Sequence, residues 1–139
     1  MTGLVFVDTA ALIALLSRDD FWYVRAHEQF ALLSGQRRPL LTSTAMLYEL
    51  LDGAAARGPM RKAAMRLASS IRNSPQWRIV HATEEHMRAG EALYASRMDK
   101  AWSLTDCTNM EIARTHDVVD VMSSDSDFEQ AGFSILLRA

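Results

Sequence analysis

Five short, mostly apolar segments recur along this chain, and longer stretches with helical character separate them. The first segment, residues 4–7, is rich in β-forming residues and ends at Asp8, which is typical of a short buried strand. The later segments have five or six residues and stand next to polar or turn-forming residues. We therefore expect five strands, at residues 4–7, 39–43, 77–81, 118–123 and 133–137.

The stretches between these segments predict helices. Residues 9–17, for example, contain too much Ala and Leu for a strand. Later helices are expected to begin at polar cap residues or at a proline in the first turn, namely Asp19 or Asp20, Ser43 or Thr44, Pro59 and Thr83. The expected helices cover residues 9–17, 20–34, 44–58, 59–73, 83–98, 105–116 and 128–131.

Helices long enough to cross over a sheet separate the first four strands, and this alternation favours parallel pairing. The expected fold is an α/β three-layer sandwich with a mostly parallel five-stranded sheet flanked by helices. The chain has 139 residues, the usual length of one domain, so we expect a single domain over residues 1–139. In such sheets, ligands bind beyond the carboxyl ends of the strands.

Composition narrows the class of protein. Apolar residues make up 49% of the chain and charged residues 23%, which is typical of a globular domain and not of a disordered segment. The single cysteine, Cys107, cannot close an intrachain disulfide, and the sequence shows neither a secretory signal nor an apolar run of about 20 residues. We therefore expect a cytoplasmic protein with no membrane partner.

Four carboxylates stand out by their positions. Asp8 and Asp125 follow predicted strands, and Asp106 stands in the first turn of a predicted helix. Glu49 belongs to a helix in which Asp52 is the only other charged residue. Each acid also has an ordinary structural explanation, as a helix cap, a first-turn acid, a turn residue or part of a solvated stripe.

The joint arrangement of these acids indicates more than each one alone. Three of them, Asp8, Asp106 and Asp125, fall on the edge of the sheet at which ligands gather. Carboxylates placed so close together would repel one another unless a cation joined them. Several hard oxygen ligands suit Mg²⁺ or Mn²⁺, and such an ion can assist hydrolysis of a phosphodiester.

At these residues the chain resembles PIN-domain ribonucleases, and more narrowly the VapC-type toxins of toxin–antitoxin pairs. The matching segments follow the family order over nearly the whole chain: residues 5–9 (VFVDT), 43–50 (STAMLYEL), 99–107 (DKAWSLTDC) and 123–133 (SSDSDFEQAGF). The resemblance places the catalytic and metal-binding acids at Asp8, Glu49, Asp106 and Asp125. It places supporting hydroxyl groups at Thr9 and Thr105.

Two departures from the family pattern affect the expected site. The segment before the last acid carries Ser123 where relatives usually have Thr. Ser126 and Asp127 stand where close relatives often have a basic residue and a His. Asp127 is therefore a candidate fifth metal ligand, an acid that supports the ligands from behind, or a residue that faces water, and its presence leaves the number of metal ions open.

The resemblance implies a function and partners. It implies a Mg²⁺- or Mn²⁺-dependent endoribonuclease toxin in which metal-activated water cleaves RNA, leaving a 5′-phosphate and a 3′-hydroxyl. It also implies a homodimer that a cognate antitoxin protein inhibits. Two alternatives stay open: a non-catalytic PIN-like module that binds RNA or protein, and a PIN nuclease outside toxin–antitoxin systems.

A basic stretch is the candidate surface for RNA. Residues 53–83 contain six basic residues and no acid, although a solvated helix face would look the same. Arg57 and Arg61 flank the Gly58-Pro59 break, and we expect them to contact RNA. The aromatic residues of the second predicted helix (Trp22, Tyr23 and Phe30) are expected in the core or at a dimer or antitoxin surface.

Overall fold

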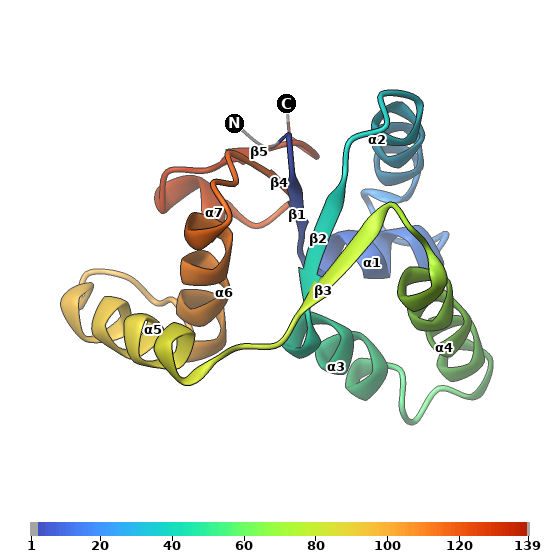
Figure 1. Cartoon of the computed structure of the whole chain (residues 1–139). Coiled ribbons are helices and arrows are strands. Elements are labelled where there is room, and N and C mark those ends of the chain that lie inside the picture. The colour runs from blue at the N-terminus through green and yellow to red at the C-terminus, as the bar shows by residue number, and fades with distance from the viewer. Residues whose placement is uncertain (1–2, 139) are drawn as a thin grey trace.

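The computed structural model describes residues 3–138. Within this range, five strands and seven helices alternate along the chain (Figure 1). The strands are β1 (Val5–Val7), β2 (Leu40–Ser43), β3 (Trp77–Val80), β4 (Asp120–Met122) and β5 (Ser134–Ile135). The helices are α1 (Thr9–Leu16), α2 (Tyr23–Gly35), α3 (Thr44–Gly53), α4 (Gly58–Asn73), α5 (Glu84–Ser96), α6 (Leu104–Thr115) and α7 (Ser126–Gln130).

The sheet is parallel throughout, with the strand order β3-β2-β1-β4-β5. The chain first adds β2 and β3 on one side of β1, and then returns to add β4 and β5 on the other side. The strand order therefore reverses at β1. In open α/β sheets a ligand crevice forms at this kind of reversal, beyond the carboxyl ends of the two strands that meet there, here β1 and β4.

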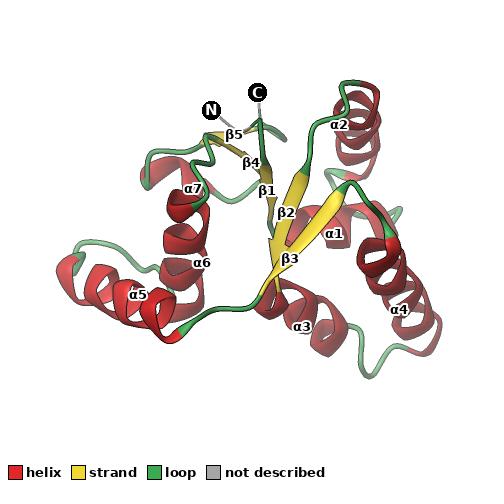
Figure 2. Ribbon diagram, in the orientation of Figure 1, coloured by secondary structure: helices red, strands yellow, loops and turns green. Residues whose placement is uncertain are grey.

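Helices cover both faces of the sheet and give the molecule three layers (Figure 2). Side chains alternate along β1, so Val5 and Val7 belong to one hydrophobic core and Phe6 to the other. The first core contains buried residues of α1, α2, α3 and α4, and the second is built mainly with α6 and α7. The expected α/β sandwich with a five-stranded sheet is confirmed.

The start of α2 and the end of α3 differ from the expected positions. The expected helix start at Asp19 or Asp20 is wrong, because Asp20 closes a turn before the helix. Its carboxylate accepts the N–H of Trp22 at 2.8 Å, and its carbonyl accepts the N–H of Tyr23 at 3.1 Å. Helix α3 ends at Gly53 and not near residue 58, because residues 54–56 form a separate turn before α4.

A close approach at Gly90 joins α5 to α6. A Cβ atom at Gly90 would lie 2.8 Å from the Cα of Thr108 and 2.4 Å from its Oγ1, so only glycine fits there. Figure 1 shows α5 next to α6 at one side of the molecule. The contact matters for the site below, because the first turn of α6 carries Asp106.

Among residues 3–138 we find no helix with the length and apolar character needed to cross a bilayer.

Candidate functional site

The carboxyl ends of β1 and β4 bring two aspartates to the point where the strand order reverses. Asp8 follows β1 directly and is the N-cap of α1, and its backbone N–H donates to the carbonyl of Met122 in β4 at 3.1 Å. Asp125 follows β4 and is the N-cap of α7. Residues more than a hundred positions apart in the sequence thus share one edge of the sheet.

Asp8 is almost fully buried, with 7% of its surface exposed. One carboxylate oxygen accepts the N–H of Thr9 at 2.8 Å, and the other accepts the hydroxyl of Ser123 at 2.7 Å. The hydroxyl oxygen of Ser123 also accepts the N–H of Asp125 at 2.9 Å. Ser123 therefore links the first and the last aspartate of the predicted quartet.

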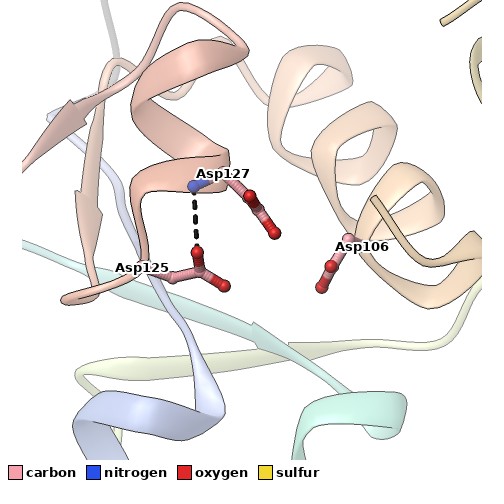
Figure 3. A group of neighbouring side chains, drawn as sticks. All are labelled: Asp106, Asp125 and Asp127. Carbon is pink, nitrogen blue, oxygen red and sulfur yellow. Dashed lines mark hydrogen bonds between the residues drawn. The ribbon is translucent and has the colours of Figure 1, made fainter. Parts of the chain in front are cut away.

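A second group of acids gathers beside Asp8. Asp106, in the first turn of α6, lies close to Asp125 and Asp127 of the α7 segment, and one oxygen from each lies within 4.8 Å of the others. In Figure 3 the three carboxylates face a shared space. The N–H of Asp127 donates to Asp125 at 2.9 Å, which holds the turn between these two acids. The structure thus adds Asp127 to the cluster that the sequence suggested.

Glu49 lies on the exposed side of α3, at the border of this group. Its pKa is raised mainly by partial burial. The nearby hydroxyl of Thr9 opposes the rise, and the charge of Asp106 adds to it. Thr9 itself is buried, and its hydroxyl donates to the carbonyl of Met46 in α3 at 2.9 Å. Thr9 thereby ties the start of α1 to the helix that carries Glu49.

The electrostatics of the acid cluster are unfavourable when no cation is bound to it. Burial is the main cause that raises the pKa of Asp8 from 3.8 to about 6, and the charges of Asp125 and Asp106 add to the shift. The pKa values of Asp106 and Asp127 are raised as well, again chiefly by burial. Among residues 3–138, no ion pair involves any of the five acids of the cluster, Asp8, Glu49, Asp106, Asp125 and Asp127.

The chemistry of the donor set fits a divalent cation. The side chains around the shared space supply carboxylate oxygens, and hard oxygen ligands of this kind suit Mg²⁺ or Mn²⁺. The raised pKa values show that negative charge is poorly compensated there, so a cation would be stabilised. Asp106, Asp125 and Asp127 have the mutual spacing that a shared ion requires.

The hydroxyl that supports Asp106 belongs to Ser103, the N-cap of α6. Its Oγ accepts the N–H of Asp106 at 3.0 Å, and its own N–H donates to the carboxylate of Asp106 at 3.4 Å. Thr105, which the family resemblance suggested, lies in the wall of a neighbouring cavity. The S-x-x-D spacing of a capping box could have indicated Ser103 from the sequence.

Two buried polar residues beside the cluster, Ser43 and Asn109, form a hydrogen bond that the sequence did not predict. Asn109, on α6, accepts a hydrogen bond from the hydroxyl of Ser43, the N-cap of α3, and donates to the carbonyl of Thr105 at 2.8 Å. Both Asn109 and Ser43 are 1% exposed. This pair fixes the first turn of α6 against the start of α3, and so sets the position of Asp106 relative to Glu49.

The two arginines predicted to contact RNA do not lie at the cluster. Arg57 is the N-cap of α4, and Arg61 donates to the carbonyl of Ala55 at 3.0 Å. Both side chains are exposed, and both residues follow the end of α3 at Gly53, which is four residues beyond Glu49. Among residues 3–138, no ion pair joins either arginine to the acids.

Comparisons with known proteins agree with this geometry. The family model of the PIN domain matches residues 5–134. The solved structure of VapC20 from Mycobacterium tuberculosis, described as a toxin that cleaves the sarcin–ricin loop, is 25% identical, with a TM-score of 0.80. That match covers 93% of this chain and 95% of the other.

A second solved structure supports the fold alone. A chain of the VapBC2 complex from Rickettsia felis, solved with a DNA fragment from its promoter, is 10% identical, with a TM-score of 0.71. The match covers 95% of this chain and 96% of the other. No curated protein sequence matches this chain.

The resemblance to VapC-type PIN domains that the sequence motifs suggested is confirmed by these matches. The family model spans nearly the whole chain, and the parallel sheet brings the motif acids to its ligand-binding edge. The chain therefore belongs to the PIN domain family.

Proposed function

We propose that this protein is a divalent-metal-dependent endoribonuclease toxin of the VapC type, built as a single domain over residues 1–139. The observation that carries the proposal is the gathering of five carboxylates from four distant segments, without a cationic partner among the described ion pairs. The PIN family match and the likeness to a toxin that cleaves RNA point to the same activity.

Asp106, Asp125 and Asp127 would hold the ion, with Asp8 behind them. Both oxygens of Asp8 already accept hydrogen bonds, so this carboxylate is fixed and keeps a negative charge behind the ion site. A bound Mg²⁺ or Mn²⁺ supplies Lewis acidity, which stabilises the charge that develops on the phosphoryl oxygens.

Glu49 is the exposed acid of the cluster, and its place suits a different role. Its carboxylate lies on the solvent side of α3 near Asp106, where water can reach it. Its raised pKa makes it a better proton acceptor than an ordinary exposed glutamate. We assign to Glu49 the orientation of the attacking water, and to Thr9 the positioning of the helices that carry Asp8 and Glu49.

RNA, a cognate antitoxin and a second copy of this chain are the proposed partners. The exposed arginines Arg57 and Arg61 would contact phosphates of a long RNA away from the cleaved bond. Phe21 is 86% exposed and Val24 65% exposed at the start of α2, and apolar residues left in water in this way often mark a protein contact. Trp22 and Phe30, in contrast, pack against the core.

RNA cleavage by the purified protein tests the proposal. We expect cleavage of structured RNA, with a sarcin–ricin loop hairpin as the first substrate, in Mg²⁺ or Mn²⁺ and none in EDTA. Asp8→Asn is expected to lower the rate at least about 100-fold, because it removes one charge from the ion site. The products should carry 5′-phosphate and 3′-hydroxyl ends.

Asp52→Asn is the matched control, since Asp52 is an exposed acid on the same helix as Glu49. Its cleavage rate should equal that of the wild type. Expression in bacteria gives a second readout: growth should stop with the wild type and continue with Asp8→Asn. Cleavage that persists in EDTA, or that survives Asp8→Asn, would contradict the proposed function.

A further inference from the structure

A cavity of about 300 Å³ lies where the segment between α5 and α6 passes the first turn of α6. Its walls include two aromatic residues, Tyr94 and Trp102, and two cationic residues, Arg97 and Lys100. Cys107, which directly follows Asp106 in the chain, also lines it. The cavity therefore lies next to the proposed catalytic acids but is not formed by them.

The two cations of this cavity have different surroundings. The guanidinium of Arg97 makes two hydrogen bonds of 3.0 Å to the carboxylate of Asp99, which balances its charge. Lys100 takes part in no ion pair within the described chain. Its ammonium lies near enough to Asp127 to oppose the rise in the pKa of that carboxyl. Lys100 thus lines the cavity, and its charge acts on one acid of the cluster, Asp127, as well as on Asp99.

Trp102 forms the inner wall of the region. It is 4% exposed, and the guanidinium of Arg97 lies 5.0 Å from the centre of its ring. Its indole N–H is the buried side-chain polar atom that has no hydrogen-bond partner within residues 3–138. Buried polar groups are usually paired, so an unpaired one beside a cavity marks a place where a ligand oxygen would be stabilised.

We propose that this cavity binds one nucleotide of the RNA substrate, next to the bond that is cleaved, with Lys100 contacting a phosphate and the aromatic walls contacting the base. The inference rests on the proposed function and adds a substrate-binding site to it. A cation beside aromatic side chains is the combination by which proteins hold single-stranded RNA. The volume falls at the lower end of the usual range for small ligands, roughly 300–1,000 Å³.

The position of Lys100 explains how RNA could approach a negatively charged centre. Without a cation nearby, the five carboxylates would repel a phosphate. Lys100 lies near enough to Asp127 to oppose the rise in its pKa, whereas neither Arg57 nor Arg61 is among the charges that shift the pKa values of the acids. The structure thus favours the segment before α6 over the basic stretch of α4 as the site that holds the nucleotide at the acids.

The chain offers a matched pair of variants, because Lys62 and Lys100 are its only lysines. Binding of a fluorescent single-stranded RNA would be measured by anisotropy at several salt concentrations, with all variants in the Asp8→Asn background so that the RNA stays intact. Lys100→Met should raise Kd about three- to tenfold and lower the slope of log K against log salt by about 0.7, the loss of one phosphate contact. Lys100→Arg should keep the slope. With an RNA too short to reach α4 from the acids, Lys62→Met on α4 should leave both quantities unchanged.

A fluorescence measurement keeps the test valid if Lys100→Met does not fold. RNA added to the Asp8→Asn protein should change its tryptophan emission, and Trp102→Phe should remove the change while Trp22→Phe keeps it. The inference is overturned if Lys100→Met binds with the affinity and slope of its parent, if Lys62→Met loses as much, or if Trp102 gives no signal.

These outcomes separate the inference from the proposed function. Normal binding by Lys100→Met, combined with metal-dependent cleavage by the wild type, would overturn the nucleotide site and leave the nuclease intact. Loss of binding in Lys100→Met, with no cleavage by the wild type under any metal, would leave an RNA-binding site on a protein that is not a nuclease. That second result would reject the proposed function.

Discussion

The three aspartates of the predicted quartet all stand at helix starts, as their sequence positions suggested. Asp8 and Asp125 cap α1 and α7, and Asp106 belongs to the capping box of α6. Asp125 and Asp106 also lie close enough to Asp8 that their charges raise its pKa. Helix capping and ligand binding are therefore compatible here, because the amino end of a helix partly offsets the negative charge of the carboxylates gathered there.

The buried carboxyl of Asp8 predicts a pH-dependent stability in the absence of divalent cations. Its pKa rises from 3.8 to about 6 on folding, so the folded protein binds more protons than the unfolded chain between these values. The free energy of unfolding should therefore fall as pH rises from about 4 to about 6, and stay low above that range. Asp8→Asn should remove this loss, which amounts to about 3 kcal/mol at pH 7.

Urea unfolding in EDTA between pH 4 and pH 8 measures this effect. Asn caps helices as well as Asp does, so the variant keeps its helix start. Asp99→Asn is the control with the opposite sign. The pKa of Asp99 is lowered to about 2 by its hydrogen bonds to Arg97. At pH values above the pKa that Asp99 has in the unfolded chain, this exposed acid therefore adds stability instead of removing it. An Asp8→Asn protein no more stable than the wild type at pH 7 would contradict the assignment.

Among the helices, α5 and α6 form a pair whose spacing depends on one glycine. Gly90→Ala should destabilise the protein by about 1–3 kcal/mol, because the new Cβ would meet the backbone of Thr108. Gly35→Ala, at the end of α2, is the control: no atom lies within 4 Å of the added Cβ. That substitution should be neutral or stabilising by less than about 1 kcal/mol.

Thermal unfolding of the two glycine variants compares these positions directly. Hydrogen exchange shows where the structure is destabilised. Amides of α5 should exchange faster in Gly90→Ala, while the exchange of β1 and β2 amides should change less. Equal stability of Gly90→Ala and Gly35→Ala would mean that α5 does not need the close approach.

For the molecule as a whole, the sheet topology creates a site that needs a cation. Charges from α1, α6 and α7 converge where the strand order reverses, and this convergence costs stability in the absence of a metal. A ligand that binds only the folded state returns that stability, by about 2.7 kcal/mol at a concentration one hundred times its Kd.

Calorimetry with and without Mn²⁺ tests this linkage. The wild type should unfold at a higher temperature with Mn²⁺. Asp106→Asn should be as stable as the wild type, or more stable, in EDTA, because the pKa of Asp106 is raised by burial, and it should gain less from the metal. Asp52→Asn should gain as much as the wild type. Equal gains in Asp106→Asn and the wild type would place the ion elsewhere.

Much of the architecture could be predicted because it depends on local pattern. The apolar strands next to polar turns, and cap residues such as Ser43 and Thr83, indicate elements through interactions within a few residues. The boundaries failed where two signals competed. Asp20 suits a helix cap and a turn equally well, and the fold uses it in the turn.

The candidate site was predicted in part, for a physical reason. The family motifs, matched in order along the chain, singled out Asp8, Glu49, Asp106 and Asp125 as candidate acids. The motifs could not rank the burial of these acids, since Asp8 is buried and Glu49 exposed only through the packing of α1 and α3. Asn109 has no distinguishing feature in the sequence. Ser103 has only the spacing of a capping box and Ser123 only its place in a family motif, and neither feature shows which acid the hydroxyl contacts.

From the sequence alone came the order of strands and helices, a mostly parallel sheet and four candidate acids, because these follow from periodicity, crossover length and family motif. Packing between elements brings Asp127 to Asp106 and Asp125, lets Ser123 link Asp8 to the start of α7, and places Lys100 in the wall of a cavity. Those relations join residues from different elements, and their distances depend on how the helices pack across the sheet, which no local pattern of side chains specifies.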